Sequence, residues 1–519
     1  MTATPESAVD SRPRTVLPVP FGEVVELFDT RTGAASRNSG SDVLLTGVTL
    51  TSKDVRPGDL YAAVAGANTH GARFAGAAVA AGAVAVLTDV TGAEEVARTA
   101  ATVPVVVVDD PRRELGDVAA LVYGHPAERL RTIGVTGTQG KTTVTYLAES
   151  GVAGAGVRAG VVGTIGTRIA GRPVSSALTT PEAPQLHGLF AAMLEQQVAA
   201  CVMEVSSHAL VLGRVGGVVF DVAVFLNLGH DHLDFHATLQ EYFEAKATLF
   251  TAEHARCAVI NVDDDHGRQL LARTELPVTT ISADAGAGRA ADWTATRHRP
   301  DAGGTTFDAI GPGGVTEVRV PLPGAFNVTN ALAVVAALVA AGYRADEVAA
   351  GIATCPGVPG RMEQVVAGQD FTALVDYAHK PEALQAVLEA LGPVTDGRLI
   401  VVVGAGGDRD TGKRPLMGRI AATACDLLIV TDDNPRTEDP AGIRRQIIDG
   451  TQQAEPRRAE VVQIAGRRDA IAYAVSLART GDCLLVAGKG HERGQEINGT
   501  VHPFDDREVL RALLTAEAP

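Results

Sequence analysis

The stretch GVTGTQGKTT, at residues 134–143, places glycines, a lysine and threonines between a short apolar run and a helical pattern. Gly137 and Gly140 allow the backbone to turn its N–H groups toward an anion, and the start of a helix favours negative charge. Lys141 can reach the β- and γ-phosphates of a nucleotide, and the Thr142 hydroxyl can hold Mg²⁺. We predict an ATP-binding loop, although a valine stands where the strict pattern has its first glycine. The alternative is a glycine-rich turn without a ligand.

Two polar stretches follow the next apolar runs. In MEVSSHAL (203–210), Glu204 lies near the end of a strand pattern, where a buried carboxylate is costly unless it meets a cation or hydrogen-bond donors. NLGHDHLDFH (227–236) holds three histidines and two aspartates, a set that suits Mg²⁺ or Mn²⁺. We predict a metal site here. The alternatives are a salt-bridged acid at a strand end and a solvated polar loop.

Basic groups gather in the last third of the chain. GRME, DYAHKP and GDRDTGKRP hold Arg361, His379, Lys380 and Arg409, and DDNPRTEDP (432–440) surrounds Arg436 with four acids. A guanidinium can grip a phosphate or carboxylate with two parallel hydrogen bonds. Each residue alone is typical of a protein surface. Together, at predicted strand ends, they indicate an anionic ligand held between two domains.

The elements that must position these polar side chains show the strand–helix alternation typical of α/β proteins. Short β-branched apolar runs alternate with helical patterns, which predicts mainly parallel sheets covered on both faces, and ligands then bind at the carboxyl ends of the strands. The length suggests about three domains. We expect a disordered segment at 1–20, a small N-terminal α/β domain at 21–130, a central ATP-binding domain of the P-loop type at 131–361, and a Rossmann-like C-terminal domain at 362–519.

The composition is that of a globular protein. The chain has 519 residues, 46% of them hydrophobic, and a net charge of −16, which argues against nucleic acid and anionic membranes as partners. The five cysteines are far apart and form no CxxC pair, so we expect free thiols. The N-terminus has no signal-peptide pattern, and the apolar stretch 331–343 is too short to span a bilayer and predicts a buried helix. We expect a cytoplasmic monomer that does not insert into membranes.

The motifs occur in the order found in Mur ligases, and from about residue 45 onward the chain resembles that family. The motifs that carry the resemblance are GTQGKTT, MEVSSH, DHLDFH, EAKATLF, FNVTNALA, GRMEQV, DYAHKP, GDRDTGKRPLM, DDNPRTEDP and GKGHE. The resemblance implies an ATP-dependent ligase of peptidoglycan synthesis. Its substrate would be UDP-MurNAc-L-Ala-D-Glu, whose terminal carboxylate ATP phosphorylates to an acyl phosphate before the amino group of diaminopimelate attacks.

The resemblance also implies roles for individual residues. Lys141, Glu204, His232 and Lys246 match catalytic positions, and Thr142, Glu204, His232 and Lys246 match magnesium-associated ones. Lys246 would carry a carbamate derived from CO₂, whereas the helical pattern EYFEAKATLF (241–250) taken alone predicts a solvated surface lysine. The positions around ATP are Gly137, Thr138, Gln139, Gly140, Lys141, Thr142, Thr143, Asn327, Arg361 and Asp376. Those that contact the UDP-MurNAc-dipeptide are Leu50, Ser52, Ala67, Asn68, Thr69, Thr179, Thr180, Ser206 and Arg214.

By the same resemblance, the loops of the C-terminal domain form the amino-acid pocket. Its residues are Arg409, Asp433, Asn434, Pro435, Arg436, Gly488 and Glu492. The two arginines can take the distal carboxylate of diaminopimelate, and the two acids can take its ammonium. The sequence does not distinguish the meso from the LL isomer. L-Lysine lacks the distal carboxylate and would leave donors unpaired.

Three alternatives stay open. A sister ligase would add L-lysine, and a folylpolyglutamate synthase would share the ATP core but leave residues 20–110 without a role. A non-catalytic ATP-binding regulator should have lost Lys141, Glu204, His232 or Lys246, and all four are present.

Overall fold

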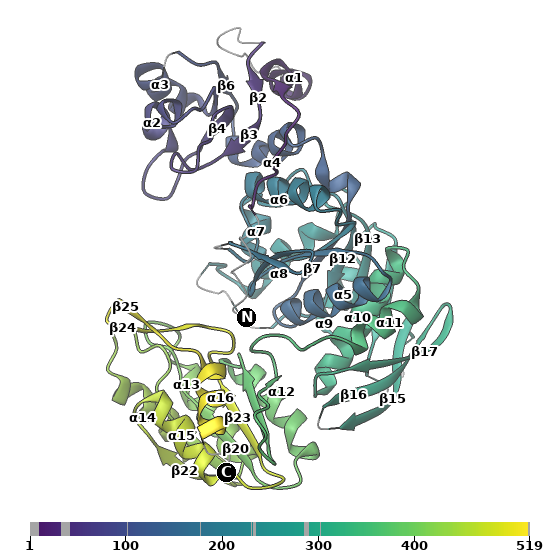
Figure 1. Cartoon of the computed structure of the whole chain (residues 1–519), viewed down its shortest axis with the longest axis vertical. Coiled ribbons are helices and arrows are strands. Elements are labelled where there is room, and N and C mark those ends of the chain that lie inside the picture. The colour runs from purple at the N-terminus through teal and green to yellow at the C-terminus, as the bar shows by residue number, and fades with distance from the viewer. Residues whose placement is uncertain are drawn as a thin grey trace, which may run out of the picture. The chain divides into compact units, whose positions relative to one another are not determined.

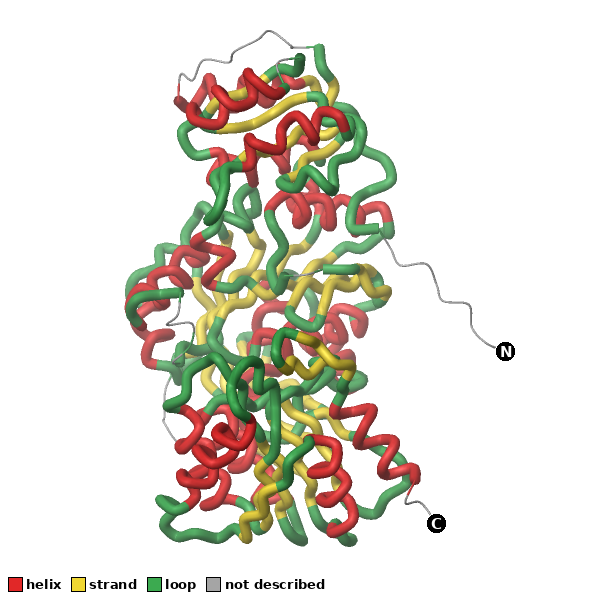
Figure 2. Tube along the Cα trace, turned by 90° about the vertical axis from the view of Figure 1, so that its left-hand side faces the viewer, coloured by secondary structure: helices red, strands yellow, loops and turns green. Residues whose placement is uncertain are grey.

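The computed structural model describes residues 10–32, 42–100, 102–176, 178–229, 231, 235–284, 290–301 and 303–516. The chain forms two compact units, Met1–Trp293 with Ala333–Gly351, and Thr294–Leu332 with Ile352–Pro519. Strands lie between layers of helices within each unit (Figures 1 and 2). The α/β class predicted from the sequence is confirmed.

The N-terminal part of the first unit is a small parallel sheet. Its strands lie in the order β3 (Gly47–Thr49), β4 (Asp59–Ala63), β5 (Ala85–Thr88) and β6 (Val105–Val107). One apolar cluster joins the sheet to α1 (Phe21–Thr32) and α4 (Pro111–Val122). A second cluster joins it to η1 (Gly71–Phe74), α2 (Ala75–Ala80) and α3 (Val90–Thr99). The short strands β1 (Val19–Pro20) and β2 (Leu44–Leu45) form a separate antiparallel pair.

Residues 10–20, whose composition led us to expect disorder, are held by charged groups. The Arg12 guanidinium donates to both carboxylate oxygens of Asp59, at 3.0 and 2.8 Å. The backbone N–H groups of Arg14 and Thr15 donate to the Glu195 carboxylate at 3.0 and 2.9 Å. These partners are distant in the sequence, so composition could not reveal them.

The central part of the first unit is a larger sheet in which β7 lies between β11 and β12. In spatial order its strands are β10 (Arg172–Val174), β9 (Gly166–Ile169), β8 (Ala159–Gly163), β11 (Ala200–Glu204), β7 (Arg131–Thr136), β12 (Phe220–Phe225), β13 (Ala255–Asn261) and β14 (Val278–Ser282). The pairs from β8 to β14 are parallel, whereas β9 and β10 are antiparallel. The mainly parallel sheet predicted for this domain is confirmed.

The helices of this central part pack closely on the sheet. Apolar residues of α6 (Ala183–Glu195) and α8 (Leu239–Ala247) share a core with the sheet. Helix α5 (Lys141–Gly154) packs against residues 333–351, where a Cβ on Gly154 would lie only 2.7 Å from the Cα of Gly351. Glycine therefore permits this close approach of two helices. The remaining elements are η2 (Pro126–Arg129), α7 (Ser207–Val211), η3 (Thr248–Phe250) and α9 (Asp265–Leu271).

The predicted buried helix around residues 331–343 is confirmed as part of α10 (Ala325–Ala340), which is followed by α11 (Ala345–Ala353). Within the described part of the chain, no helix is long and apolar enough to cross a bilayer. All five cysteines are free thiols, as predicted.

The second unit contains an antiparallel meander and a six-stranded sheet. The meander is β15 (Trp293–Asp301), β16 (Gly304–Gly311) and β17 (Gly314–Val320). The sheet has the order β18 (Glu363–Gln364), β19 (Thr372–Asp376), β23 (Cys483–Ala487), β20 (Leu399–Val403), β21 (Leu427–Val430) and β22 (Glu460–Gln463). All its pairs except β18–β19 are parallel, so the mainly parallel sheet predicted from the sequence is confirmed.

Helices cover both faces of this sheet (Figure 1). Helices α12 (Pro381–Leu391), α13 (Lys413–Ala424) and α14 (Pro440–Thr451) share one apolar cluster with the sheet, and α15 (Arg467–Leu477) and α16 (Asp506–Ala516) share another. The other elements are η4 (Gly392–Val394) and a hairpin of β24 (Gly494–Ile497) and β25 (Thr500–Pro503).

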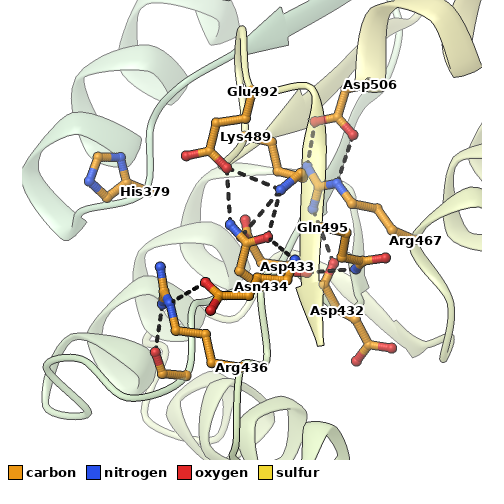
Figure 3. Close-up of polar contacts among 12 residues, drawn as sticks. His379, Asp432, Asp433, Asn434, Arg436, Arg467, Lys489, Glu492, Gln495 and Asp506 are labelled. Carbon is orange, nitrogen blue, oxygen red and sulfur yellow. Dashed lines mark hydrogen bonds and ion pairs between the residues drawn. The ribbon is translucent and has the colours of Figure 1, made fainter. Parts of the chain in front are cut away.

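A fully buried ion pair fixes the carboxyl edge of this sheet. The side chains of Arg467 and Asp506 are both 0% exposed, and two hydrogen bonds of 2.7 Å join them. The same guanidinium donates to the backbone carbonyls of Asp432, after β21, and Ala487, at the end of β23. The pair therefore ties two neighbouring loops to α16 (Figure 3).

We predict that breaking this pair destabilises the protein more than removing it. Arg467→Met leaves a buried carboxylate without its cation, and we expect the free energy of unfolding to fall by about 3–5 kcal/mol. The double variant Arg467→Met/Asp506→Leu should recover most of that loss. Urea unfolding measures both, and Arg344→Met, which removes an exposed pair with Asp346, should change little. Equal losses in the single and double variants would contradict the prediction.

Candidate active site

The glycine-rich loop follows β7 and leads directly into α5. Gly137 and Gly140 have φ values of 156° and 89°, and Gly140 is the N-cap of the helix. The Nζ of Lys141 donates to the backbone carbonyls of Gly137 and Thr138 at 2.7 and 3.1 Å. The structure thus confirms a strand–loop–helix unit with left-handed glycines where the sequence predicts a phosphate loop. Contact with ATP remains a prediction for residues 137–143.

Asn227, immediately beyond β12, supports this loop from the neighbouring strand. Its side-chain oxygen accepts from the N–H groups of Thr138 and Gln139 at 3.1 and 2.9 Å, and its amide nitrogen donates to the Gln139 carbonyl at 3.2 Å. Asn227 was not among the predicted site residues. Its position just after an apolar strand pattern is the feature of the sequence that could have indicated a role.

Glu204 ends β11, also beside β7, and is 1% exposed. Its carboxylate accepts from the Thr142 hydroxyl at 2.8 Å and from the N–H and hydroxyl of Thr164 at 2.9 and 3.0 Å. Among the residues that the structure describes, no Lys or Arg forms an ion pair with it. A buried carboxylate that meets only neutral donors is suited to bind a cation.

Lys246 on α8 is 1% exposed, which overturns the surface position that its helical pattern alone predicts. Its Nζ donates to the Thr136 hydroxyl at 3.3 Å and to the Gly137 carbonyl at 3.1 Å, and it lies 4.6 Å from the ring centre of Tyr242. The Tyr242 hydroxyl in turn is 3.2 Å from that of Thr138. The structure therefore places Lys246 at the predicted phosphate loop, and its carboxylation and catalytic role remain predictions.

The fourth predicted magnesium-associated residue, His232, lies outside the described residues. In the described ranges, no group of three His, Cys, Asp or Glu side chains has the arrangement of a metal site. Two possible metal ligands do lie together, the hydroxyl of Thr142 and the carboxylate of Glu204. Hydroxyl and carboxylate oxygens suit a hard cation such as Mg²⁺.

The predicted dipeptide contacts cluster around the end of β11. The Thr180 hydroxyl donates to the Glu204 carbonyl at 2.8 Å and accepts from the Ser206 N–H at 3.3 Å. Arg214 donates to the Thr180 carbonyl, and the Thr179 hydroxyl is 3.1 Å from that of Thr164. Their role in substrate binding remains a prediction.

The predicted uridine contacts lie on two neighbouring loops of the N-terminal sheet. Leu50 and Ser52 follow β3, and residues 67–69 follow β4, where a turn joins the Gly66 N–H to the Thr69 carbonyl at 3.1 Å. Ala67 and Asn68 are exposed. Because β3 and β4 are parallel neighbours, both loops lie at the same edge of the sheet.

The remaining predicted ATP contacts belong to the second unit. Asn327, at the start of α10, is 2% exposed and donates to the Pro323 carbonyl. The Arg361 guanidinium lies 4.4 Å from the ring centre of Tyr377. Asp376 ends β19 and accepts from two backbone N–H groups, while burial raises the pKa of its carboxyl group. Their contact with ATP remains a prediction.

Hydrogen bonds join the loops after β21 and β23 at the carboxyl edge of the C-terminal sheet (Figure 3). The Nζ of Lys489 is fully buried and lies 3.0 Å from the side-chain oxygen of Asn434, 3.1 Å from Glu492 and 3.9 Å from Asp433. The Asn434 amide donates to Glu492 at 3.0 Å. Gly488 is packed against Asp433, since a Cβ on it would lie 2.7 Å from the carboxylate. An internal ammonium therefore already partners the acids predicted to take the ammonium of the ligand.

Arg436 has a left-handed backbone, with φ of 51°, and donates from Nη1 to the Gly407 carbonyl at 2.6 Å and from Nε to Glu496 at 3.1 Å. Gly407 permits the close approach of the Pro435 backbone, because a Cβ on it would lie 1.9 Å from the Pro435 carbonyl oxygen. Arg409, predicted to share the ligand carboxylate, is exposed and makes no hydrogen bond or ion pair with the described residues.

His379 lies near this cluster without a hydrogen bond to it in Figure 3. Its Nδ1 is 2.8 Å from the Tyr377 carbonyl, and burial lowers the pKa of the ring to about 4. His379 is therefore a neutral ring at physiological pH, rather than the cation that the basic stretch DYAHKP suggested.

Comparison with known proteins agrees with this architecture. Residues 44–123 match the family described as "Mur ligase family, catalytic domain", residues 135–338 the "Mur ligase middle domain", and residues 360–490 the "Mur ligase, glutamate ligase domain". A relative from Streptomyces coelicolor, named UDP-N-acetylmuramoyl-L-alanyl-D-glutamate--2,6-diaminopimelate ligase, is 48% identical over 505 residues, which cover 97% of this chain and 98% of the relative. The chain belongs to the Mur ligase family.

Solved structures extend the comparison for this Mur ligase. One, described as a UDP-N-acetylmuramoyl-L-alanyl-D-glutamate--2,6-diaminopimelate ligase, has a TM-score of 0.69 and 33% identity, and the match covers 96% of this chain and 99% of that one. A folylpolyglutamate synthase from Mycobacterium tuberculosis, complexed with ADP and AMPPCP, has a TM-score of 0.58 and 21% identity, and the match covers 72% of this chain and 91% of that one. The latter likeness shows a shared fold alone.

Several residues at the carboxyl edges of the central and C-terminal sheets of this Mur ligase were not predicted from the sequence. They are Asn227, Arg467, Lys489, Gln495, Glu496 and Asp506. Lys489 stands inside the motif GKGHE and could have been found there. The others act across loops that only the fold brings together.

We predict that Glu204→Gln makes the Mur ligase more stable without metal but abolishes its response to Mg²⁺. The amide can still accept from Thr142 and Thr164, and the substitution removes a buried charge whose described partners are all neutral. Thermal unfolding with and without Mg²⁺ measures both effects. Glu253→Gln, at an exposed position of the same domain, should behave like wild type. A variant whose melting temperature still rises with Mg²⁺ would contradict the assignment.

Proposed function

We propose that this Mur ligase joins diaminopimelate to UDP-MurNAc-L-Ala-D-Glu at the expense of ATP. The observation that carries the choice of amino acid is the loop DNPR (433–436) at the carboxyl edge of the C-terminal sheet, which supplies a guanidinium, an amide and a carboxylate. Arg436 donates to the Gly407 carbonyl, Asn434 donates to Glu492, and Asp433 lies 3.9 Å from Lys489. A zwitterionic tail needs both kinds of charge. The full-length likeness to the diaminopimelate ligase of Streptomyces coelicolor supports the same reaction.

The three parts of the chain divide the work in this proposal. Residues 21–130 bind the uridine nucleotide, residues 131–361 bind ATP and residues 362–519 bind the amino acid. The loop between β7 and α5 takes the phosphates, with Lys141 at the β- and γ-positions. ATP phosphorylates the terminal carboxylate of the dipeptide, and the amino group of diaminopimelate then displaces phosphate to form the amide. We place this reaction in the cytoplasm, where ATP and nucleotide-linked precursors are available, and take the protein to act as a monomer.

Thr142 and Glu204, together with His232, are the residues that we propose for Mg²⁺, or Mn²⁺ in its place. A bound divalent cation would offset negative charge on the transferred phosphoryl group. The buried carboxylate of Glu204, whose described partners are neutral donors, supports this assignment.

Lys246 is the residue that we propose to be carboxylated by CO₂. Its burial beside the Gly137 carbonyl supports the proposal, because a carbamate there would replace a cation by an anionic oxygen ligand for a hard metal ion.

Replacing the guanidinium tests the amino-acid pocket. For Arg436→Ala we expect kcat/KM for diaminopimelate to fall at least about 30-fold, which corresponds to the roughly 2–5 kcal/mol lost when one partner of a hydrogen-bonded charge pair is truncated. ATP affinity should not change. Amino-acid-dependent phosphate release measures the first quantity and calorimetry the second.

The same assay distinguishes the alternatives. Wild type should use diaminopimelate in preference to lysine and ornithine, and Arg511→Ala, at an exposed arginine on α16, should match it. Equal use of lysine would favour the sister ligase, and no phosphate release with any amino acid would favour the regulator.

A separate prediction concerns Lys246. Lys246→Ala should be nearly inactive, and added short carboxylates should partly restore phosphate release by supplying the missing anionic oxygen. Unchanged melting temperature would show that the loss is chemical. Full activity of the variant without added carboxylate would refute the carbamate.

A further inference from the structure

The hairpin of β24 and β25 is formed by a two-residue turn. Asn498 and Gly499 both have left-handed backbones, with φ of 49° and 75°, and the register pairs Ile497 with Thr500 and Glu496 with Val501. Asn-Gly is strongly preferred in such turns because both central residues need positive φ. The turn therefore fixes which residues of β24 face the loop that carries Arg436.

The backbone of this hairpin binds both the N–H and the carbonyl of Arg436. The Arg436 N–H donates to the Glu496 carbonyl at 3.0 Å, and the Asn498 N–H donates to the Arg436 carbonyl at 2.8 Å. The N–H of Glu496 also donates to the side-chain oxygen of Asn434 at 3.0 Å. One residue of the hairpin, Glu496, thus contacts two residues of the predicted amino-acid pocket.

The side chain of Glu496 completes this arrangement. Its carboxylate accepts from Nε of Arg436 at 3.1 Å, while the Gly407 carbonyl accepts from Nη1 at 2.6 Å. The third nitrogen, Nη2, makes no hydrogen bond to any residue in the described part of the chain. The Arg436 side chain is 24% exposed, so this nitrogen belongs to a partly accessible group.

We propose that Glu496 is a positioning residue that sets the selectivity of the amino-acid pocket by presenting Nη2 of Arg436 to the distal carboxylate of the ligand. This inference rests on the function proposed above. Because a guanidinium is planar, engaging Nε and Nη1 fixes the direction in which the N–H groups of Nη2 point. A ligand with a carboxylate there satisfies them, whereas a ligand without one leaves them unpaired.

Glu496 is negatively charged, so its position beside Arg436 is better explained by orientation of the guanidinium than by attraction of an anionic ligand. A neighbouring carboxylate partly offsets the positive charge of Arg436 and so weakens its general attraction for anions. A site that relied on charge alone would gain from the absence of Glu496. A site that relies on a fixed guanidinium direction loses its discrimination when Glu496 is removed.

The test compares Glu496→Ala and Glu496→Gln in the full-length protein. For Glu496→Ala we expect KM for diaminopimelate to rise about tenfold or more, with a smaller change in kcat, since a hydrogen bond to a charged group is lost. The ratio of kcat/KM for diaminopimelate to that for lysine should fall, and KM for ATP should not change. Glu496→Gln keeps an oxygen that can accept from Nε and should retain most of the selectivity.

Glu389→Ala, which removes an exposed carboxylate on α12 of the same unit, is the matched control and should behave like wild type. An unchanged selectivity ratio in Glu496→Ala would overturn this inference and leave the proposed function standing. A lower KM for diaminopimelate in that variant would also overturn it, because Glu496 would then be a competing anion. A wild-type protein inactive with diaminopimelate would overturn both the inference and the function.

Discussion

Parallel strands end at a common edge of their sheet, and the chemistry of this Mur ligase depends on that constraint. In the central sheet, β7, β11 and β12 are neighbours, so the phosphate loop, Glu204 and Asn227 meet although long helices separate them in the sequence. In the C-terminal sheet, β20 lies between β21 and β23, and the loops that follow β21 and β23 still meet at the carboxyl edge. Ligand-binding residues can therefore be scattered along the chain and still form a site.

The buried charged residues at the carboxyl edges of the C-terminal and central sheets have different kinds of partners. Arg467 donates two hydrogen bonds to Asp506 and two more to backbone carbonyls, so this pair acts as a fixed support for two loops. Glu204, by contrast, meets only hydroxyls and one N–H among the described residues. A charge left without an opposite charge in a protein interior costs stability, and such a cost is tolerated where the group serves a ligand.

The predicted amino-acid pocket is built from charges that already have partners. Lys489 neutralises part of the acid cluster, and Glu496 engages one nitrogen of Arg436. Partnered side chains have fixed directions, and fixed directions discriminate between ligands better than a flexible charge does. In the proposed pocket, this arrangement favours selectivity over general electrostatic attraction.

The sequence by itself determined the α/β class, the predicted strands and the helix–loop unit of the phosphate site, because apolar periodicity and glycine placement act locally. Through resemblance it also indicated that Lys246 belongs to the site, which its own helical pattern contradicts. Only the tertiary structure decided the partners of each charge. Arg12 with Asp59, Arg467 with Asp506, and Arg436 with Glu496 join residues 39–60 positions apart, and such pairs leave no periodic signal. Arg409, which the resemblance assigns to the amino-acid pocket, is exposed, and its contact with the ligand stays a prediction.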